Sequence, residues 1–177
     1  MSTKRITVTI QGKSALLMHA FPMTEIKGLE KKTPKEQAEF AAYRDDKGRL
    51  YFPAVNVGRS IVAGATYSKG RGKGTLQKPV AACLLVSPER LDLGTKDYQI
   101  DSRPVVIKAT KGRILRHRPR IEDWRLSFEV EFDDELLSEN QLRQCIDDAG
   151  SRVGIGDFRP ECKGPFGRFN VVNWELV

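Results

Sequence analysis

Residues 153–169 of the chain read VGIGDFRPECKGPFGRF and decide how its C-terminal part is interpreted. The stretch holds four glycines, two prolines and three basic residues between a predicted helix and a predicted final strand. Glycine permits positive φ angles and proline holds φ near about −65°, so the sequence predicts a loop of defined shape, with a helix C-cap and ordinary turn as the alternative. The loop also mixes basic with aromatic residues, a combination that contacts phosphates and bases. These residues are Arg159, Lys163, Arg168, Phe158, Phe166 and Phe169.

Two elements flank this loop. On its N-terminal side Trp124–Phe132 alternates strictly between apolar and polar residues, which is the period of a half-buried strand. Ser138, with Gln141 three residues later, matches the capping box that begins a helix, and this helix is predicted to run to about residue 153. Residues 168–176 follow as a closing strand. Strand, helix, loop and strand together predict a βαβ-type unit.

The preceding part of the chain predicts further strands and two more helices. Residues 5–10 alternate as a first strand, and a proline-led start predicts a helix over 35–44. Asn56 is predicted to cap a second helix over 57–67, and the apolar run 80–86 is predicted to be a strand buried on both faces. Short strands are expected at 15–18, 49–53, 98–101 and 105–107, the last two as a small accessory hairpin.

Composition sets the class of protein. At 177 residues, with 40% hydrophobic and 30% charged residues, the chain predicts one soluble domain over 1–177 with a basic insertion at about 87–121. It lacks both a run of about 18 apolar residues and a signal-peptide pattern, so we expect a cytoplasmic protein that does not enter a membrane. The three cysteines are widely spaced without a CxxC pair, which predicts neither disulfides nor a zinc site, and no metal or cofactor is expected.

The net charge of +7 is unevenly distributed. Residues 1–68 carry +5, residues 69–125 carry +8 and residues 126–177 carry −6. A basic field of this kind attracts polyanions, of which nucleic acid is the commonest large example in a cell. The acidic C-terminal part is suited to contact a basic neighbour, which includes a second copy of the chain.

Two basic segments account for most of the central charge. Residues 108–120 contain six Lys or Arg and no acid, which predicts a binding arm at least as strongly as a solvated face. Residues 68–74 are basic and glycine-spaced but do not match the P-loop, so they are predicted to be a solvated loop and no nucleotide triphosphate site is expected. The candidate RNA-binding residues are Lys108, Lys111, Arg113, Arg116, His117, Arg118, Arg120, Arg59, Lys69, Arg71 and Lys73, with Arg159, Lys163 and Arg168 of the glycine-rich stretch.

Several of these stretches resemble the RAMP superfamily of CRISPR-associated RNA-binding proteins. The strand at 6–10 and the apolar segment 16–19 look like the family's opening, and residues 51–61 are similar to its entry into the first long helix. The glycines at 154–156 and the sequence GPFGRF at 164–169 resemble the family's C-terminal G-rich loop. The chain departs from the pattern in having Ala54 where the family usually has Gly, in lacking the K-G-x-x-R spacing, and in being short for a backbone subunit.

The resemblance implies an α+β fold with a ferredoxin-like (RRM-like) β-α-β-β-α-β core that carries inserted basic loops or a hairpin. It also implies a sequence-independent RNA-binding subunit that holds guide RNA or another single-stranded RNA by its backbone. Such a subunit would be part of a CRISPR-type ribonucleoprotein or a repeating filament. The implied partners are the RNA, other copies or subunits of the complex, and a target nucleic acid.

Two other functions stay open, although we expect a binding protein rather than an enzyme. The first is a metal-independent endoribonuclease, because RNA-processing members of the same superfamily use a histidine as general acid or base, and His19 and His117 are the two histidines of the chain. The second is a protein-interaction module or inhibitor that mimics such a subunit. The acidic clusters at 133–135 and 147–148 are predicted to be solvated or to cap elements rather than to bind metal.

Overall fold

The main sheet organises the computed structural model, which describes residues 2–177. It is antiparallel, has the strand order β4-β8-β1-β9, and consists of β4 (Leu85–Ser87), β8 (Arg125–Asp133), β1 (Thr3–Gly12) and β9 (Phe169–Leu176). Because β8 and β9 both run antiparallel to β1, they are parallel to each other, and the helix α4 (Glu139–Asp148) connects them. The predicted βαβ-type unit is therefore present, with β1 between its two strands.

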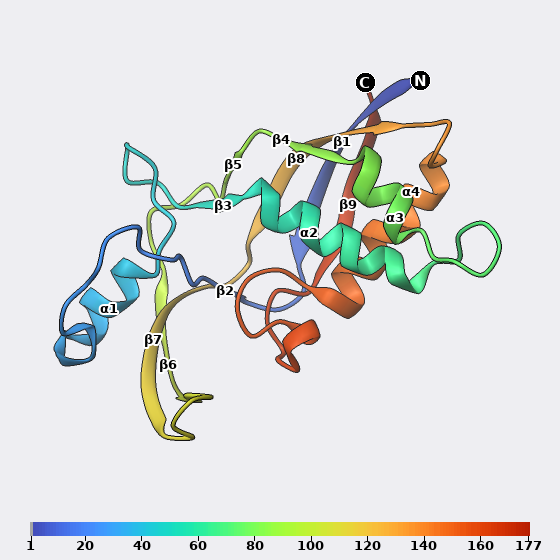
Figure 1. The fold of residues 1–177 in the computed structure, drawn as a ribbon. Helices are drawn as coiled ribbons and strands as arrows, with labels where there is room; N and C mark the ends of the chain where they lie inside the picture. Colours follow the sequence, from blue (N-terminus) through green and yellow to red (C-terminus); the bar gives the residue numbers. More distant parts are fainter. Residues whose placement is uncertain (1) are drawn as a thin grey trace.

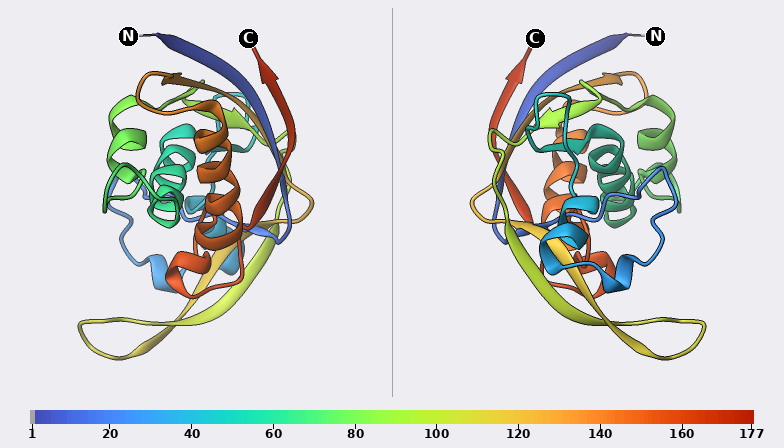
Figure 2. Two further views of the ribbon diagram at one scale, coloured as in Figure 1. Left: turned by 90° about the vertical axis from the view of Figure 1, so that its right-hand side faces the viewer. Right: turned by 90° about the vertical axis from the view of Figure 1, so that its left-hand side faces the viewer.

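Three helices cover one face of this sheet, as the two side views show (Figure 2). They are α2 (Ala54–Gly64), α3 (Gln77–Cys83) and α4. The core lies between the helices and the sheet, and it contains Ile6, Val8, Ile10, Leu126, Phe128, Val130, Val57, Ile61, Leu142 and Ile146, all buried. Four α-helices within residues 2–177, together with antiparallel sheets, make the chain a mixed α+β protein.

The other face of the main sheet is polar. Its residues pair across the strands, with the Thr9 and Ser127 hydroxyls 2.8 Å apart and Arg5 Nε 2.7 Å from Glu131 Oε2. Trp174 is opposite Val8 in the register and therefore points toward the helices, where its indole N–H donates to Glu139. The outward-facing side chains thus provide no aromatic platform for bases.

A second sheet leaves the body of the protein as a long hairpin. The strands β6 (Gln99–Val106) and β7 (Arg113–Ile121) form this hairpin, which we call the basic hairpin, and β2 (Leu16–Leu17) pairs with its base. The hairpin extends beyond the rest of the molecule (Figure 1). The short strands β3 (Tyr51–Pro53) and β5 (Arg90–Asp92) form a two-stranded sheet. The remaining elements are α1 (Pro34–Phe40), the short 3-10 helices η1 (Leu29–Lys31), η2 (Ala65–Tyr67) and η4 (Pro160–Cys162), and the π-helix η3 (Ala149–Val153), which continues α4.

Local sequence signals predicted several elements correctly. The strand at 124–132 is β8, whose even-numbered residues from Leu126 to Phe132 are buried. The predicted capping box of Ser138 and Gln141 forms at α4, and the proline-led start at α1 is capped by Thr33, which also forms a capping box with Glu36. The helix predicted over 35–44 ends at Phe40, four residues early.

Three predictions are wrong. Residues 80–86 are not one buried strand: α3 continues to Cys83 because Ala81 and Ala82 favour a helix and face solvent, and only Leu85–Ser87 is a strand. The accessory hairpin within 98–107 is instead one strand, β6, which pairs with the predicted arm at 113–121. Pro104 is tolerated in β6 because β6 is the edge strand of its sheet.

The third error concerns Asn56. It does not cap α2, because this helix already begins at Ala54 after Pro53, so Asn56 lies in the first turn.

No helix within residues 2–177 is long and apolar enough to cross a bilayer. Over the same residues there is no group of three or more His, Cys, Asp or Glu side chains that could hold a metal ion.

Candidate nucleic-acid interface

A cleft of about 460 Å³ lies between the start of α2, the segment after β2 and the Gly-rich loop, by which we mean residues 154–168. We call it the central cleft. The positive end of the α2 dipole lies beside it, because Asn56 belongs to the first turn of that helix and lines the cleft. The lining residues are His19, Tyr43, Phe52, Asn56, Arg59, Ser60, Gly154, Ile155, Gly156, Asp157, Arg159 and Glu161.

The Gly-rich loop is a fixed wall of this cleft. Gly167 has a φ of 74°, and a Cβ there would overlap the Ile155 carbonyl oxygen, so only glycine fits. The Ser60 hydroxyl of α2 donates to the Gly154 carbonyl at 2.7 Å, and the Asp157 N–H donates to the backbone of β2 at 2.8 Å. The prediction of a loop of defined shape is therefore confirmed.

The aromatic residues of the loop are part of the core rather than a surface for bases. Phe166 and Phe169 are only 6% and 2% exposed, and Phe158 packs against Phe166 with 6.1 Å between ring centroids. Phe166 forms a small apolar cluster with Ala15 and the buried Leu17 of β2, which fixes the loop to the body. The expectation that these phenylalanines alternate with the basic residues as a base-binding surface is wrong for Phe166 and Phe169.

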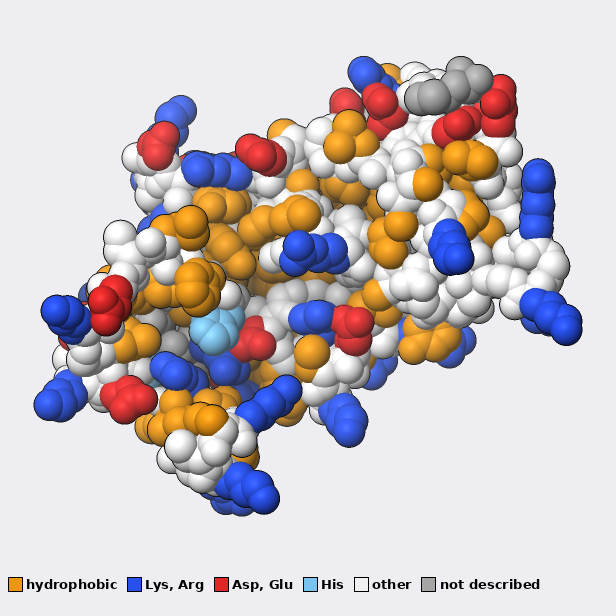
Figure 3. Space-filling view, in the orientation of Figure 1, with side chains coloured by type: hydrophobic (Ala, Val, Ile, Leu, Met, Phe, Trp, Pro, Cys, Tyr) orange, Lys and Arg blue, Asp and Glu red, His pale blue; other side chains and the backbone are white. Residues whose placement is uncertain are grey.

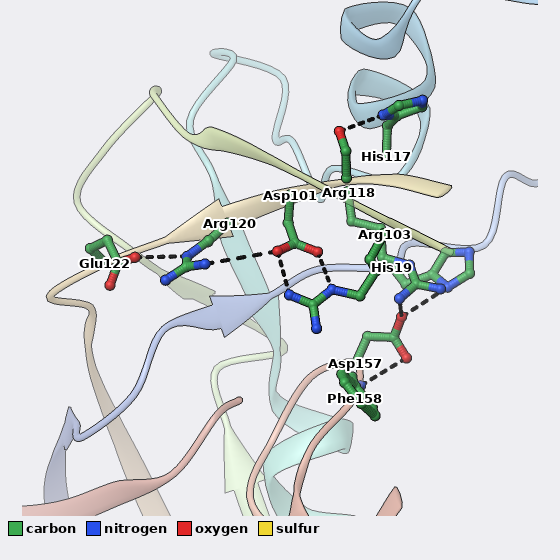
Figure 4. A network of polar contacts seen from close by, with 10 residues as sticks. His19, Asp101, Arg103, His117, Arg118, Arg120, Glu122, Asp157 and Phe158 are labelled. Carbon is green, nitrogen blue, oxygen red and sulfur yellow. Dashed lines mark hydrogen bonds and ion pairs between the residues drawn. The ribbon is translucent and has the colours of Figure 1, made fainter. Parts of the chain in front are cut away.

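One carboxylate links the loop, the basic hairpin and the segment after β2. Arg118 from β7 places Nη1 2.8 Å from Asp157 Oδ2, and His19 Nδ1 lies 3.4 Å from the same oxygen (Figure 4). Burial by itself would raise the pKa of Asp157, but His19, the charge of Arg118 and the Phe158 N–H outweigh it and hold that pKa below its usual value. Asp157 is therefore an anion at neutral pH and neutralises the mostly buried Arg118.

A second carboxylate occupies the base of the basic hairpin. The buried Asp101 accepts two hydrogen bonds from Arg103, at 2.6 and 2.7 Å, and Arg120 Nη1 lies 3.8 Å from it. Arg120 also donates to Glu122 at 2.7 Å (Figure 4). The Arg103 guanidinium lies 4.7 Å from the centroid of the Phe166 ring, so this pair fastens the hairpin to the Gly-rich loop.

The predicted RNA-binding residues separate into paired and unpaired cations. Arg118 and Arg120 are held by carboxylates, Arg159 pairs with Glu161 at 2.7 Å, and Arg168 donates to the Ser151 carbonyl. Across residues 2–177, no carboxylate lies within ion-pair distance of the other predicted cations. These unpaired residues are Lys108, Lys111, Arg113 and Arg116 of the basic hairpin, Arg59 of the central cleft, Lys163 of the Gly-rich loop, and Lys69, Arg71 and Lys73 of the loop between η2 and α3.

These cations do not all lie on one surface. The tip of the basic hairpin and the loop with Lys69 extend from opposite ends of the molecule (Figure 1), and Lys and Arg side chains project at both ends in the space-filling view (Figure 3). Arg59, Arg159 and His19 meet in the central cleft, near the base of the hairpin. The structure thus brings together the hairpin, α2 and the Gly-rich loop, and separates the segment 68–74 from them.

The two histidines have different surroundings. His19 is half-exposed beside Asp157 in the central cleft. His117 shares a hydrogen bond of 2.6 Å with Ser102 on the neighbouring strand and points away from the Asp157 cluster (Figure 4). Of the two, only His19 therefore combines a carboxylate partner with the wall of the cleft.

Sequence reasoning missed three residues of the cleft. Tyr43 was not considered because nothing near it in the sequence indicates a site, and Asn56 was interpreted as a helix cap. Asp157 lies in the stretch 153–169, but only the basic and aromatic residues of that stretch were considered. All three line the central cleft although they come from separate parts of the chain.

The comparisons with known proteins find a similarity among solved structures and none in sequence. No protein-family model and no curated protein matches the sequence. Among solved structures, the fold is similar to a chain in the cryo-EM structure of the type III-B Cmr-beta bound to cognate target RNA, with a TM-score of 0.57 over 99% of this chain. The sequence identity is 10%, and the chain spans 61% of the length of that structural relative. The similarity therefore concerns the fold.

Proposed function

We propose that the protein is an RNA-binding subunit of a CRISPR-type ribonucleoprotein, which holds guide RNA or another single-stranded RNA by its sugar-phosphate backbone. The observation that carries this proposal is the set of unpaired cations on the basic hairpin, next to a cleft that contains Arg59. Side chains without a carboxylate partner are free to neutralise phosphates and to release condensed counterions. The similar fold of a chain in an RNA-bound CRISPR complex supports the same function.

The proposal includes a ferredoxin-like core. The elements β1, α2, β4, β8, α4 and β9 follow the order β-α-β-β-α-β, and the first strand lies between the third and the last. We infer that this core extends through one domain, residues 1–177. The basic insertion at 87–121 then lies between the second and third core strands and contains the basic hairpin.

Backbone recognition fits this surface better than base recognition on the sheet. An RRM stacks bases on aromatic residues of its open sheet face, whereas that face here carries hydroxyl and charged side chains such as Thr9, Ser127 and Glu131. The cations lie instead on the hairpin and around the cleft. RNA held in this way is bound largely without regard to sequence.

The charge distribution supports an assembly with further subunits. Seven of the nine unpaired cations belong to residues 69–125, whereas β8, α4 and β9 belong to the acidic C-terminal part. Opposite charges on different parts of one molecule favour contacts between the basic part of one copy and the acidic part of the next. Copies of the chain, other subunits of the complex and a target nucleic acid are the proposed partners.

Binding to a labelled single-stranded RNA, measured by fluorescence anisotropy at several salt concentrations, tests this function. We expect the logarithm of the association constant to fall linearly with the logarithm of salt. Absence of RNA binding, together with salt-insensitive association with a protein, would instead support an interaction module or inhibitor.

The pairing of His19 with Asp157 favours a second candidate, metal-independent RNA cleavage. A carboxylate that orients an imidazole leaves its other nitrogen free to accept the proton of a ribose 2′-hydroxyl, whose oxygen then attacks the adjacent phosphorus. The P–O5′ bond breaks, which leaves a 2′,3′-cyclic phosphate on one fragment and, once the departing oxygen takes a proton from water, a 5′-hydroxyl on the other. Incubation of end-labelled RNA in EDTA decides this point: cleavage that His19→Ala abolishes and His117→Ala retains would establish it. RNA that stays intact with the unaltered protein would eliminate it.

A further inference from the structure

The interior of the central cleft differs in chemistry from the basic hairpin. Tyr43 forms part of its lining, and its ring packs edge-on against Phe52, with centroids 6.1 Å apart and an angle of 79°. The ring is also tilted against Tyr51 at 5.6 Å. These contacts fix the orientation of an aromatic ring that is half-buried at the cleft.

Asn56 supplies a polar group beside this ring. Burial raises the pKa of the Tyr43 hydroxyl, so the hydroxyl is neutral at physiological pH, and Asn56 lines the same cleft. An amide side chain has two donor hydrogens and two acceptor lone pairs. A fixed aromatic ring next to an amide that can both donate and accept is suited to a nucleobase.

The charges in the cleft disfavour a phosphate in its interior. Arg159 is already paired with Glu161 at 2.7 Å, and the Asp157 carboxylate is part of the wall. A phosphate between these two carboxylates would be repelled, whereas a neutral base would not. Of the unpaired cations, Arg59 is part of the lining at α2, and the others lie outside the cleft, most of them on the hairpin.

We propose that the central cleft holds one unstacked nucleobase of the bound strand, with Tyr43 contacting its face and Asn56 hydrogen-bonding its edge. The cleft volume of about 460 Å³ lies within the range of about 300–1,000 Å³ of small-molecule sites. Adenine is the expected preference, because an Asn amide makes a bidentate pair with its donor and acceptor atoms. This inference rests on the proposed RNA-binding function and adds a base contact to it.

Two probes of equal length and charge test the inference. One is a single-stranded RNA of adenosine nucleotides, and the other has the same backbone with abasic residues throughout. We expect the unaltered protein to bind the adenosine strand about tenfold more tightly, which corresponds to stacking and hydrogen bonding of one base. The salt dependence should be the same for both probes, because their phosphates are the same.

Asn56→Ala locates the contact. Alanine is a good helix former at this position in α2, so the variant is expected to fold. Its affinity for the adenosine strand should fall to within about threefold of its affinity for the abasic strand, whose binding stays unchanged. Asn173→Ala, at an exposed position of β9 on the main sheet, is the matched control and should behave as the unaltered protein.

The possible results are distinct. Equal affinity of the unaltered protein for the two strands would overturn the base site while leaving the backbone-binding function intact. A preference for the adenosine strand that Asn56→Ala does not reduce would assign the base contact to another place and also overturn the proposal. Failure to bind either strand would contradict the proposed function itself.

Discussion

Under the proposed RNA-binding function, single ion pairs decide which cations can reach the RNA. Arg118 and Arg120 belong to the densest basic run of the sequence, yet carboxylates hold both of them at the base of the hairpin. Arg116 and Lys111, in the same run, have no such partner among residues 2–177. We therefore expect the first two to stabilise the fold and the last two to contact the polyanion.

Asp157 provides the test of this assignment. Its carboxylate neutralises Arg118, which is only 8% exposed, so Asp157→Asn leaves a buried guanidinium without a counter-charge. The expected loss in free energy of unfolding at pH 7 is about 2 kcal/mol, less than the ~3–5 kcal/mol of a fully buried pair because the Asp157 side chain is 30% exposed. Urea denaturation followed by circular dichroism measures this loss.

The loss in free energy of unfolding caused by Asp157→Asn should depend on pH. The folded state holds the pKa of Asp157 below its ordinary 3.8, so the stabilisation is complete above that pKa and is lost as the pH falls through the lower folded-state pKa. The difference between the unaltered protein and Asp157→Asn should thus be constant from pH 5 to 7 and shrink below about pH 3.8. Asp147→Asn, which removes an exposed partner of Arg143, is the control and should cost under about 1 kcal/mol at any pH. Equal losses for the two variants would refute the role of Asp157.

The sequence predicted the charged residues of the site better than their partners. A basic run such as 108–120 can be recognised from the sequence alone, because it has six cations within thirteen residues. The pairing of Arg118 with Asp157, and the position of Tyr43 beside Asn56, depend on contacts between parts of the chain that are far apart in sequence. No local period or spacing records such contacts.

At the scale of elements, the glycines of α2 have separate functions. A Cβ on Gly64 would come within 2.6 Å of the Ala149 backbone nitrogen at the end of α4, so α2 and this turn approach each other closely only because Gly64 has no side chain. A Cβ on Gly58 would meet only Val86 Cγ2, at the ordinary distance of 3.7 Å. Of the two glycines, Gly64 therefore allows a close approach to a neighbouring backbone, whereas Gly58 does not.

This contrast predicts opposite effects of the same substitution. Gly64→Ala should reduce the free energy of unfolding by about 1–3 kcal/mol through overpacking. Gly58→Ala should raise it by up to about 1 kcal/mol, since alanine favours the helix and finds space. Thermal denaturation of both variants measures the effects, and a destabilising Gly58→Ala would show that α2 is packed more tightly there than the distances indicate.

Elements with a strong local signal were predictable, and elements defined by pairing were not. The β8 strand, the capping box of α4 and the proline-led start of α1 follow from period and spacing. The extent of β6 could not be predicted, because its partner β7 was interpreted as a separate arm. The apolar run 80–86 was wrongly predicted for a different reason: buried strands and short helices have the same apolar composition, so composition alone does not distinguish them.

At the scale of the whole molecule, the basic hairpin and the acidic C-terminal elements give the protein two chemically different parts. The hairpin extends away from the main sheet (Figure 1), and the central cleft lies near its base. An RNA strand that follows the hairpin would therefore reach the cleft without crossing the acidic strands. From this arrangement we expect phosphate contacts on the hairpin to be the main source of RNA affinity.

The most direct test is the salt dependence of RNA binding by a hairpin variant. The triple substitution Lys111→Gln, Arg113→Gln and Arg116→Gln removes three unpaired cations and should reduce the slope of log association constant against log salt by about 2, since each phosphate contact on single strands contributes about 0.7. A control with Arg5→Gln, Arg49→Gln and Arg143→Gln removes three cations that are already paired with carboxylates. The account predicts a reduced slope for the hairpin variant and an unchanged slope for the control. Equal slopes for the hairpin variant and the unaltered protein would contradict it.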